Sequence, residues 1–393
     1  MSKFKLSLCQ TLDDRWTNFE DEILRLQRKH QNVEIILRYI EDDYKLWRVM
    51  KLHGSHVRSL HFGNGNFSTA ARLRGILSEL PLVESLKFSS CNVLTNAKNQ
   101  SNSLNISLTH LIFEDSSWRI MDFIKAPNLK FLKVHGGFQG HAKSLTAFLS
   151  ASYELTSIAF DETSFESTFA SEIIYEFQLV HLEIQTYDKL ANTRVEQNFN
   201  EFLKKQKRLE QLDLRYCASQ DVIDTVFNCL SNLTSLKIVV TCFPDYAKFY
   251  KKFKLLNRLK LLEVYGDFPN KTSAKEILKL CPNIEVLIVH NDLLTSSLLS
   301  FMASHNPQIK ELSLATIYET FNPKFFFKNL KVFEIKHLTD YDTWFSFALG
   351  HKTIETLILK TFGSKTLHHV CLFDQLKHVK SFSFLQFNES CSF

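Results

Sequence analysis

Glycine, proline and paired cysteines are scarce in this chain, and the shortages exclude several kinds of site. Only 10 of the 393 residues are glycine, and no glycine-rich phosphate-binding loop occurs. The 8 cysteines include no Cys-x-x-Cys pair, which argues against zinc binding by paired cysteines and favours a reducing, intracellular setting. The motifs His-Glu-x-x-His and Gly-x-Ser-x-Gly are also absent. We therefore expect a protein that is not an enzyme, with no catalytic residue, no cofactor and no bound metal ion.

Long apolar runs and a strong net charge are missing too. No stretch approaches the roughly 18 apolar residues that span a bilayer, and the first five residues lead into no apolar run of signal-peptide length. The formal net charge is +5 and is spread along the chain; two local basic runs, 204–208 and 248–258, are interpreted as solvated helix ends. We expect a cytoplasmic monomer, with the nucleus as a further location, and neither a membrane nor a nucleic acid as partner.

An apolar motif recurs along most of the chain. Each copy has apolar residues at its first, fourth and sixth positions, and successive copies start 21 to 30 residues apart. The fourteen copies are Val57/Leu60/Phe62, Val83/Leu86/Phe88, Leu108/Leu111/Phe113, Leu129/Leu132/Val134, Leu155/Ile158/Phe160, Leu179/Leu182/Ile184, Leu209/Leu212/Leu214, Leu233/Leu236/Ile238, Leu259/Leu262/Val264, Ile284/Leu287/Val289, Ile309/Leu312/Leu314, Leu330/Phe333/Ile335, Ile354/Leu357/Leu359 and Val379/Phe382/Phe384.

One copy shows how a repeat is built. An apolar face with helical spacing runs from Leu73 to Leu80, and Pro81 ends that helix because proline cannot continue the hydrogen-bond ladder. The motif that follows predicts a strand in which Leu86 and Phe88 point inward and the residues between them point outward. The chain therefore alternates helix and strand, and strands joined by helical crossovers pair in parallel.

The period and spacing of the motif resemble those of leucine-rich repeats. The resemblance implies an α/β solenoid of horseshoe shape, with a parallel sheet on the concave face and helices and irregular turns on the convex face. We assign an array of about 14 repeats to residues 57–393 and degenerate capping repeats to residues 1–56. Cys91 and Cys217 follow the motif where such repeats carry Asn or Cys, and both are interpreted as buried turn residues.

The first 56 residues also predict alternating strands and helices, but their apolar patterns are less regular. Residues 4–8 and 32–37 alternate like strands, and a capping box at Thr17 and Glu20 predicts the start of a helix. A short helix is expected around residues 46–50.

Residues 44–60, followed by irregular repeats of about 25 residues, resemble the repeat region of F-box/leucine-rich-repeat proteins, especially the divergent insect kind. The resemblance implies a receptor that captures a protein substrate and docks through a Skp-type adaptor onto a cullin ubiquitin ligase. An F-box opens with Leu-Pro, however, and the first proline here is Pro81. Residues 31–37 also read as a strand where an F-box needs helix.

We interpret residues 1–56 as the segment that follows an F-box, so adaptor and cullin are partners only if an F-box lies upstream. One alternative is a degenerate F-box within residues 21–47. The other is a stand-alone scaffold without a link to a ligase.

The repeat register predicts a binding face on the strands, where outward side chains mix both charges with aromatic rings. Such a mixture suits a protein partner and suits a phosphate backbone poorly; the alternative is that these are solvated sheet residues. The candidates are Phe131, Lys133, His181, Glu183, Asp213, Arg215, Lys237, Glu263, Tyr265 and His290. A metal site at His368, His369 and Cys371 is a weaker alternative, because no fourth ligand is evident.

Overall fold

The computed structural model describes most of the chain, in two compact units. The described residues are 4–9, 21–25, 33–38, 43–67, 69–93, 104–116, 120–122, 124–136, 142–170, 175–186, 193–241, 243, 250–266, 268, 271–290, 296–316, 326–337, 341–362 and 376–387. Unit 1 comprises Met1–Thr186 with Asn192–Gln206, and unit 2 comprises Tyr187–Ala191 with Lys207–Phe393.

Unit 1 contains a parallel sheet whose strands follow one another in chain order. In sheet order they are β1 (Phe4–Cys9), β2 (Val33–Arg38), β3 (Val57–Gly63), β5 (Ser85–Ser89), β8 (His110–Glu114), β10 (Phe131–His135), β11 (Ser157–Asp161) and β12 (His181–Gln185). Two short parallel pairs join β4 (Asn66–Phe67) to β6 (Asn92–Val93) and β7 (Leu104–Asn105) to β9 (Ile124–Lys125). The helices are residues 21–25, α2 (Asp43–His53), η1 (Gly54–His56), α3 (Ala70–Ser78), α4 (Ala142–Ser150), α5 (Glu162–Phe169) and α6 (Thr193–Lys205).

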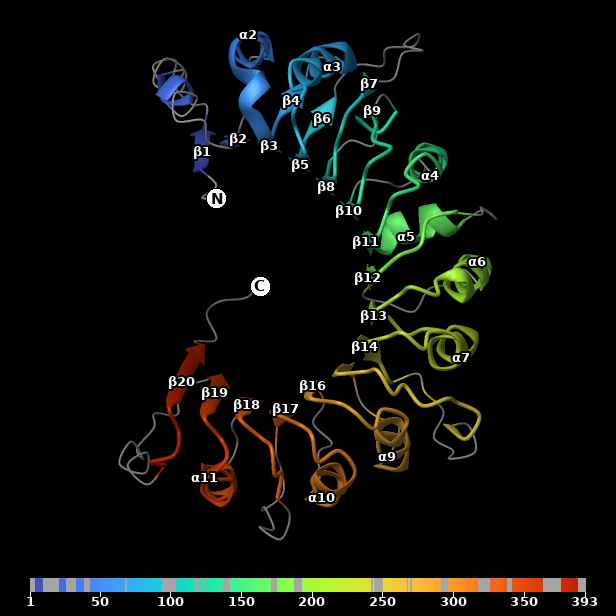
Figure 1. The fold of residues 1–393 in the computed structure, drawn as a ribbon, viewed down its shortest axis with the longest axis vertical. Coiled ribbons are helices and arrows are strands. Elements are labelled where there is room, and N and C mark those ends of the chain that lie inside the picture. The colour runs from blue at the N-terminus through green and yellow to red at the C-terminus, as the bar shows by residue number, and fades with distance from the viewer. Residues whose placement is uncertain are drawn as a thin grey trace. The chain divides into compact units, whose positions relative to one another are not determined.

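Unit 2 repeats this plan. Its parallel sheet runs through β13 (Gln211–Arg215), β14 (Ser235–Val239), β15 (Leu261–Tyr265), β16 (Val286–His290), β17 (Glu311–Thr316), β18 (Val332–His337), β19 (Thr356–Phe362) and β20 (Ser381–Phe387). Its helices are α7 (Gln220–Cys229), α9 (Lys271–Leu280), α10 (Ser296–His305) and α11 (Tyr341–Gly350). Within each unit the labelled helices lie on one side of the sheet (Figure 1).

The core forms because equivalent residues of successive copies stack on one another. In β14, β15 and β16, Leu236 pairs with Leu262, which in turn pairs with Leu287. In the first thirteen copies of the motif, all three apolar residues are at most 1% exposed. The stacked apolar side chains of these thirteen copies account for the regular pairing, since a shift of one residue would turn the motif residues within a strand outward.

The fourteenth copy departs from this expectation. Phe382, in β20, is 40% exposed, whereas Leu357, its partner in β19, is fully buried. Among the described residues, β20 is the last strand of the sheet and pairs with β19.

Several predicted elements are present with small shifts of their ends. The strands expected at 4–8 and 32–37 are β1 and β2, and the short helix expected near 46–50 lies within α2. The helix expected before Pro81 is α3, in which Leu73, Ile76 and Leu77 are buried. Its start is capped by Thr69, whose hydroxyl accepts a hydrogen bond from the backbone N–H of Arg72 at 3.1 Å. The capping box at residues 17–20 lies outside the described residues.

The two turn cysteines differ. Cys91 is buried, as predicted, and its Sγ donates to the backbone carbonyl of Phe62, in β3, at 3.3 Å. Cys217 is half-exposed, so the prediction that it is buried is wrong. In that turn the neighbours Tyr216 and Ala218 are buried instead.

Amide side chains tie successive copies of unit 2 together. The residue just before the motif donates its side-chain N–H to a backbone carbonyl two residues before the motif of the preceding copy. These bonds run from Asn232 to Lys207 (2.7 Å), from Asn283 to Asn257 (2.8 Å), from Gln308 to Pro282 and from Asn329 to Pro307 (2.9 Å). We call this series the amide ladder. It satisfies carbonyls at the turn and fixes the spacing between neighbouring copies.

Candidate binding face

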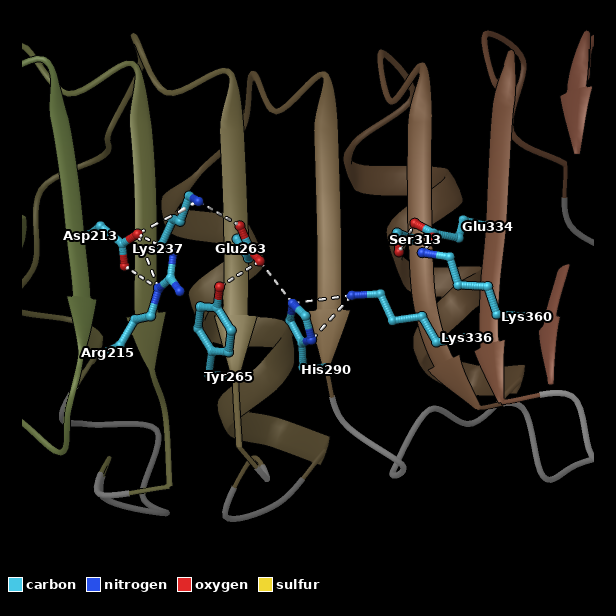
Figure 2. A network of polar contacts seen from close by, with 10 residues as sticks. All are labelled: Asp213, Arg215, Lys237, Glu263, Tyr265, His290, Ser313, Glu334, Lys336 and Lys360. Carbon is cyan, nitrogen blue, oxygen red and sulfur yellow. Dashed lines mark hydrogen bonds and ion pairs between the residues drawn. The ribbon is translucent and has the colours of Figure 1, made fainter. Parts of the chain in front are cut away.

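Side chains of unit 2 form a polar network, with a second polar group beside it, on the sheet surface that faces away from the helices (Figure 2). We call this surface the strand face of unit 2. Side chains alternate between the two faces of a strand, so residues two apart share a face. Asp213 and Arg215 therefore lie on the same side of β13, and Glu263 and Tyr265 lie on the same side of β15. Because the strands pair in register, equivalent positions on neighbouring strands lie side by side.

Asp213 lies at one end of the network. Its carboxylate is nearly buried, with 5% of the residue exposed. Arg215 donates to both of its oxygens, from Nε to Oδ1 at 3.1 Å and from Nη2 to Oδ2 at 2.9 Å. The ammonium of Lys237, on the next strand, lies 3.6 Å from Asp213 and 3.3 Å from Glu263. Lys237 therefore joins the two carboxylates and offsets the cost of burying them.

Glu263 is the centre of the network. The Tyr265 hydroxyl donates to its Oε1 at 2.7 Å, and Nε2 of His290 lies 2.8 Å from the same oxygen. Burial alone would raise the pKa of Glu263, but these hydrogen bonds and the charge of Lys237 outweigh burial and lower its pKa to about 2. Burial and the hydrogen bond to Glu263 raise the pKa of Tyr265. At neutral pH the pair is thus a carboxylate and a neutral phenol.

His290 links this group to Lys336. The Lys336 ammonium lies 3.1 Å from Nδ1 and 3.3 Å from Nε2. The carboxylate of Glu263 can only accept, so Nε2 of His290 carries the hydrogen of their contact. The imidazole also stacks on Tyr265, and the guanidinium of Arg215 lies 5.6 Å from the Tyr265 ring centre.

A second carboxylate group lies on β17, β18 and β19. Ser313 donates to Glu334 at 2.7 Å, and Lys360 lies 2.5 Å from the other oxygen of Glu334. Burial would raise the pKa of Glu334, but Lys360 and Ser313 outweigh it and lower the pKa. Burial is the main cause that lowers the pKa of Lys336. Within the described residues, Lys336 makes no ion pair with a carboxylate.

On the strand face of unit 1, the corresponding sheet surface, a polar group surrounds Glu114. Glu114 lies between Lys87, at 2.7 Å, and Lys133, at 3.7 Å, and it accepts a hydrogen bond from Ser89 at 3.0 Å. Burial would raise the pKa of Glu114, but these partners outweigh it and lower the pKa. The ring of Phe131 lies 5.7 Å from that of His110.

The remaining candidates of unit 1 lie on β12, two strands from β10. Nδ1 of His181 is 3.1 Å from the Ser157 hydroxyl, and Glu183 accepts from Gln185. Phe131, Lys133, His181 and Glu183 are all half-buried. The six candidates of unit 2, by contrast, form one connected group of contacts.

Sequence reasoning missed several members of these groups. Glu114, Ser313, Glu334, Lys336 and Lys360 all occupy outward positions of the strand register. The motif itself could have identified them. The alternation of inward and outward side chains, applied to the earlier and later copies, selects these positions as outward ones.

Other kinds of site find little support in the described part of the chain. There, no group of three or more His, Cys, Asp or Glu residues could hold a metal ion. His368, His369 and Cys371 lie outside the described residues. Likewise, none of the helices that can be described has the length and apolar character needed to cross a bilayer.

Comparison with known proteins adds no family assignment. A scan of the sequence against protein-family models finds no match, and a search of curated proteins finds none.

Proposed function

We propose that this chain is a leucine-rich-repeat protein of horseshoe shape whose strand faces line the concave side and bind a protein partner. The observation that carries the proposal is the connected group of Arg215, Tyr265 and His290, held together on the sheet surface opposite the helices (Figure 2). Arginine and tyrosine are among the residues most often found at the energetic centres of protein interfaces.

The internal contacts of the group support binding rather than mere solvation. Arg215 is held by Asp213, and Tyr265 and His290 are held by Glu263. Side chains that are already ordered lose less conformational entropy when a partner binds. The charges also alternate along the face, which suits selection among protein partners better than attachment to a polyanion.

The test is a triple variant, Arg215→Ala, Tyr265→Ala and His290→Ala. A partner would first be captured from cell extract with the parent chain, then purified and titrated against each version by calorimetry. We expect the triple variant to bind that partner about 100-fold more weakly, because three anchors of one surface are lost together, while its far-UV circular dichroism is unchanged.

A matched control carries the same residue types on other surfaces. Arg194, Tyr153 and His305 are exposed, and their joint replacement by alanine should leave the affinity unchanged. If the two triple variants bound the partner equally well, the strand face of unit 2 would not be the binding site.

We propose further that the bound protein is a substrate of a cullin ubiquitin ligase. The support is the resemblance of residues 44–60 and the following repeats to F-box/leucine-rich-repeat proteins. In this role the chain performs no chemistry and raises the local concentration of the substrate near the ligase. A stand-alone scaffold is the alternative, and binding of the Skp-type adaptor distinguishes the two.

A further inference from the structure

A strong positive charge gathers at the edge of unit 2 where the chain enters each strand. We define the entry segment of a strand as the five residues from three before to one after the first apolar residue of its motif. The eight entry segments of unit 2 contain ten cationic side chains and three carboxylates, a net charge of +7. The cations are Lys207, Arg208, Arg258, Lys260, Lys310, Lys328, Lys331, Lys352, Lys377 and Lys380.

Unit 1 lacks this charge. The six entry segments from β3 to β12 contain two cations, Arg58 and Lys130, and three carboxylates, so their net charge is −1. The repeat architecture is the same in both units and does not require the cations. The charge of unit 2 is therefore a property of its sequence that the fold leaves unexplained.

The ten cations lie along one edge of a single sheet. Strands β13 to β20 are parallel and in register, so their entry segments follow one another along the same edge. All ten side chains are exposed. With strands about 4.8 Å apart, seven steps cover about 34 Å. We call this surface the basic edge.

Part of the charge is neutralised within the edge. Glu285 lies 2.6 Å from both Lys260 and Lys310. Glu355 lies 3.7 Å from Lys331 and 2.9 Å from Lys380.

The other six cations make no ion pair within the described residues. They are Lys207, Arg208, Arg258, Lys328, Lys352 and Lys377. Arg258 is held in place by a hydrogen bond from its Nη1 to the side-chain oxygen of Asn232 at 2.8 Å. Like charges so close together repel, and an acidic partner would relieve that repulsion.

We propose that the basic edge is a second binding surface, which takes an extended acidic segment of a protein. It uses residues other than those of the strand face, so it stands apart from the function proposed above. An extended peptide of about twelve residues is about 40 Å long and would follow the whole edge. Such a segment can place neutral residues opposite Glu210, Glu285 and Glu355, whose carboxylates would repel acidic ones.

Nucleic acid fits the basic edge less well. A phosphate chain carries charge at every step and cannot avoid the three glutamates of the edge. Single strands also bind by stacking their bases on exposed aromatic rings. The phenylalanine of the entry segments, Phe327, is fully buried. Eight of the ten cations are lysines, whereas the paired hydrogen bonds typical of phosphate recognition are formed by arginines.

The test uses a fluorescein-labelled peptide of about twelve residues in which Asp and Glu alternate with Ser and Gly, long enough to span the edge. Its binding to the full chain is followed by fluorescence anisotropy at low ionic strength. We expect binding that weakens with added salt, because exposed charges are screened. The variant Lys328→Gln, Lys352→Gln and Lys377→Gln should bind the peptide about tenfold more weakly.

The control variant removes the same charge elsewhere. Lys125, Lys143 and Lys271 are exposed and lie outside the entry segments, and their joint change to Gln should leave the affinity near that of the parent. The triple variant of the strand face should also bind the peptide normally, so that failure of this proposal is distinguishable from failure of the proposed function.

Three results would overturn the proposal. The first is an equal loss of affinity in the control, which would reflect net charge alone. The second is no detectable binding of the peptide at low ionic strength. The third is tighter binding of a single-stranded oligonucleotide of the same charge, which would assign the edge to nucleic acid.

Discussion

The imidazole of His290 lies against the ring of Tyr265, with ring centres 4.5 Å apart and planes 13° from parallel. Both side chains donate to the same oxygen of Glu263. One buried carboxylate therefore holds two aromatic side chains of neighbouring strands in a fixed orientation. The position of each ring depends on the charge of that carboxylate, which makes the group sensitive to acid.

Stability should depend on pH through Glu263. Its pKa is about 2 in the folded chain, against an ordinary value of 4.5. A carboxyl group with a lowered pKa stabilises the fold above its ordinary pKa, and this stabilisation is lost as pH falls from 4.5 towards 2. Glu263→Gln should reduce that loss by about 2 kcal/mol, a figure discounted for screening at the sheet surface.

The measurement is the free energy of unfolding in urea between these pH values. Glu210→Gln, which removes an exposed carboxylate, is the control and should keep the pH dependence of the parent. A Glu263→Gln variant that loses stability as steeply as the parent would show that another group titrates.

The inward register of the motif predicts a severe effect of Leu212→Asp. Leu212 is 1% exposed, and a charge buried there without a partner should destabilise the fold by about 4 kcal/mol. Since each repeat contacts its neighbours, we expect cooperative unfolding to be lost over several repeats. Thermal unfolding followed by circular dichroism measures this. Leu255→Asp is the matched control, because Leu255 is 53% exposed, and it should leave the transition near that of the parent.

The amide ladder should contribute to stability at each copy. Asn283→Ala removes the donor to the Asn257 carbonyl and should cost about 1 kcal/mol, the typical value of a hydrogen bond in a protein. Asn257→Ala keeps the backbone carbonyl that accepts this bond, so it should change stability by less than about 0.5 kcal/mol. Urea unfolding of the two variants gives the comparison. Equal effects would mean that the amide–carbonyl bond does not stabilise the array.

The chain itself should not bind a Skp-type adaptor. Residues 33–38 form β2, which pairs with β1 and β3, whereas an F-box needs helix there. Calorimetry with a purified adaptor tests this, and an F-box protein that opens with Leu-Pro serves as the positive control. Binding by the present chain would instead identify residues 21–47 as a degenerate F-box.

The sequence predicts the core well because the spacing of the apolar motif residues is compatible with only one secondary structure and one direction of their side chains. Leu86 and Phe88 are two residues apart. Both side chains can therefore be buried together only in a strand, where they point to the same face of the sheet, the face that the helices cover. Contacts among outward residues are less predictable, because Lys237 could pair with a carboxylate on either neighbouring strand and in fact reaches both.

Some elements give weak signals in sequence. Helix α5 follows β11 without a connecting turn, and Asp161, the last residue of the strand, caps it by accepting from the N–H of Ser164 at 2.9 Å. The short pairs β4–β6 and β7–β9 consist of two-residue strands, too short to show an alternating pattern.

The exposed Phe382 has a consequence for how the array opens. Each inner strand of unit 2 is held by neighbours on two sides, but β20 is held in the described structure by β19 alone. In a one-dimensional array, the free energy needed to open an element falls when one of its two interfaces is missing. Amide hydrogens of β20 should therefore exchange with solvent earlier than those of β19 and β18, so that fraying proceeds inward along unit 2 from this strand.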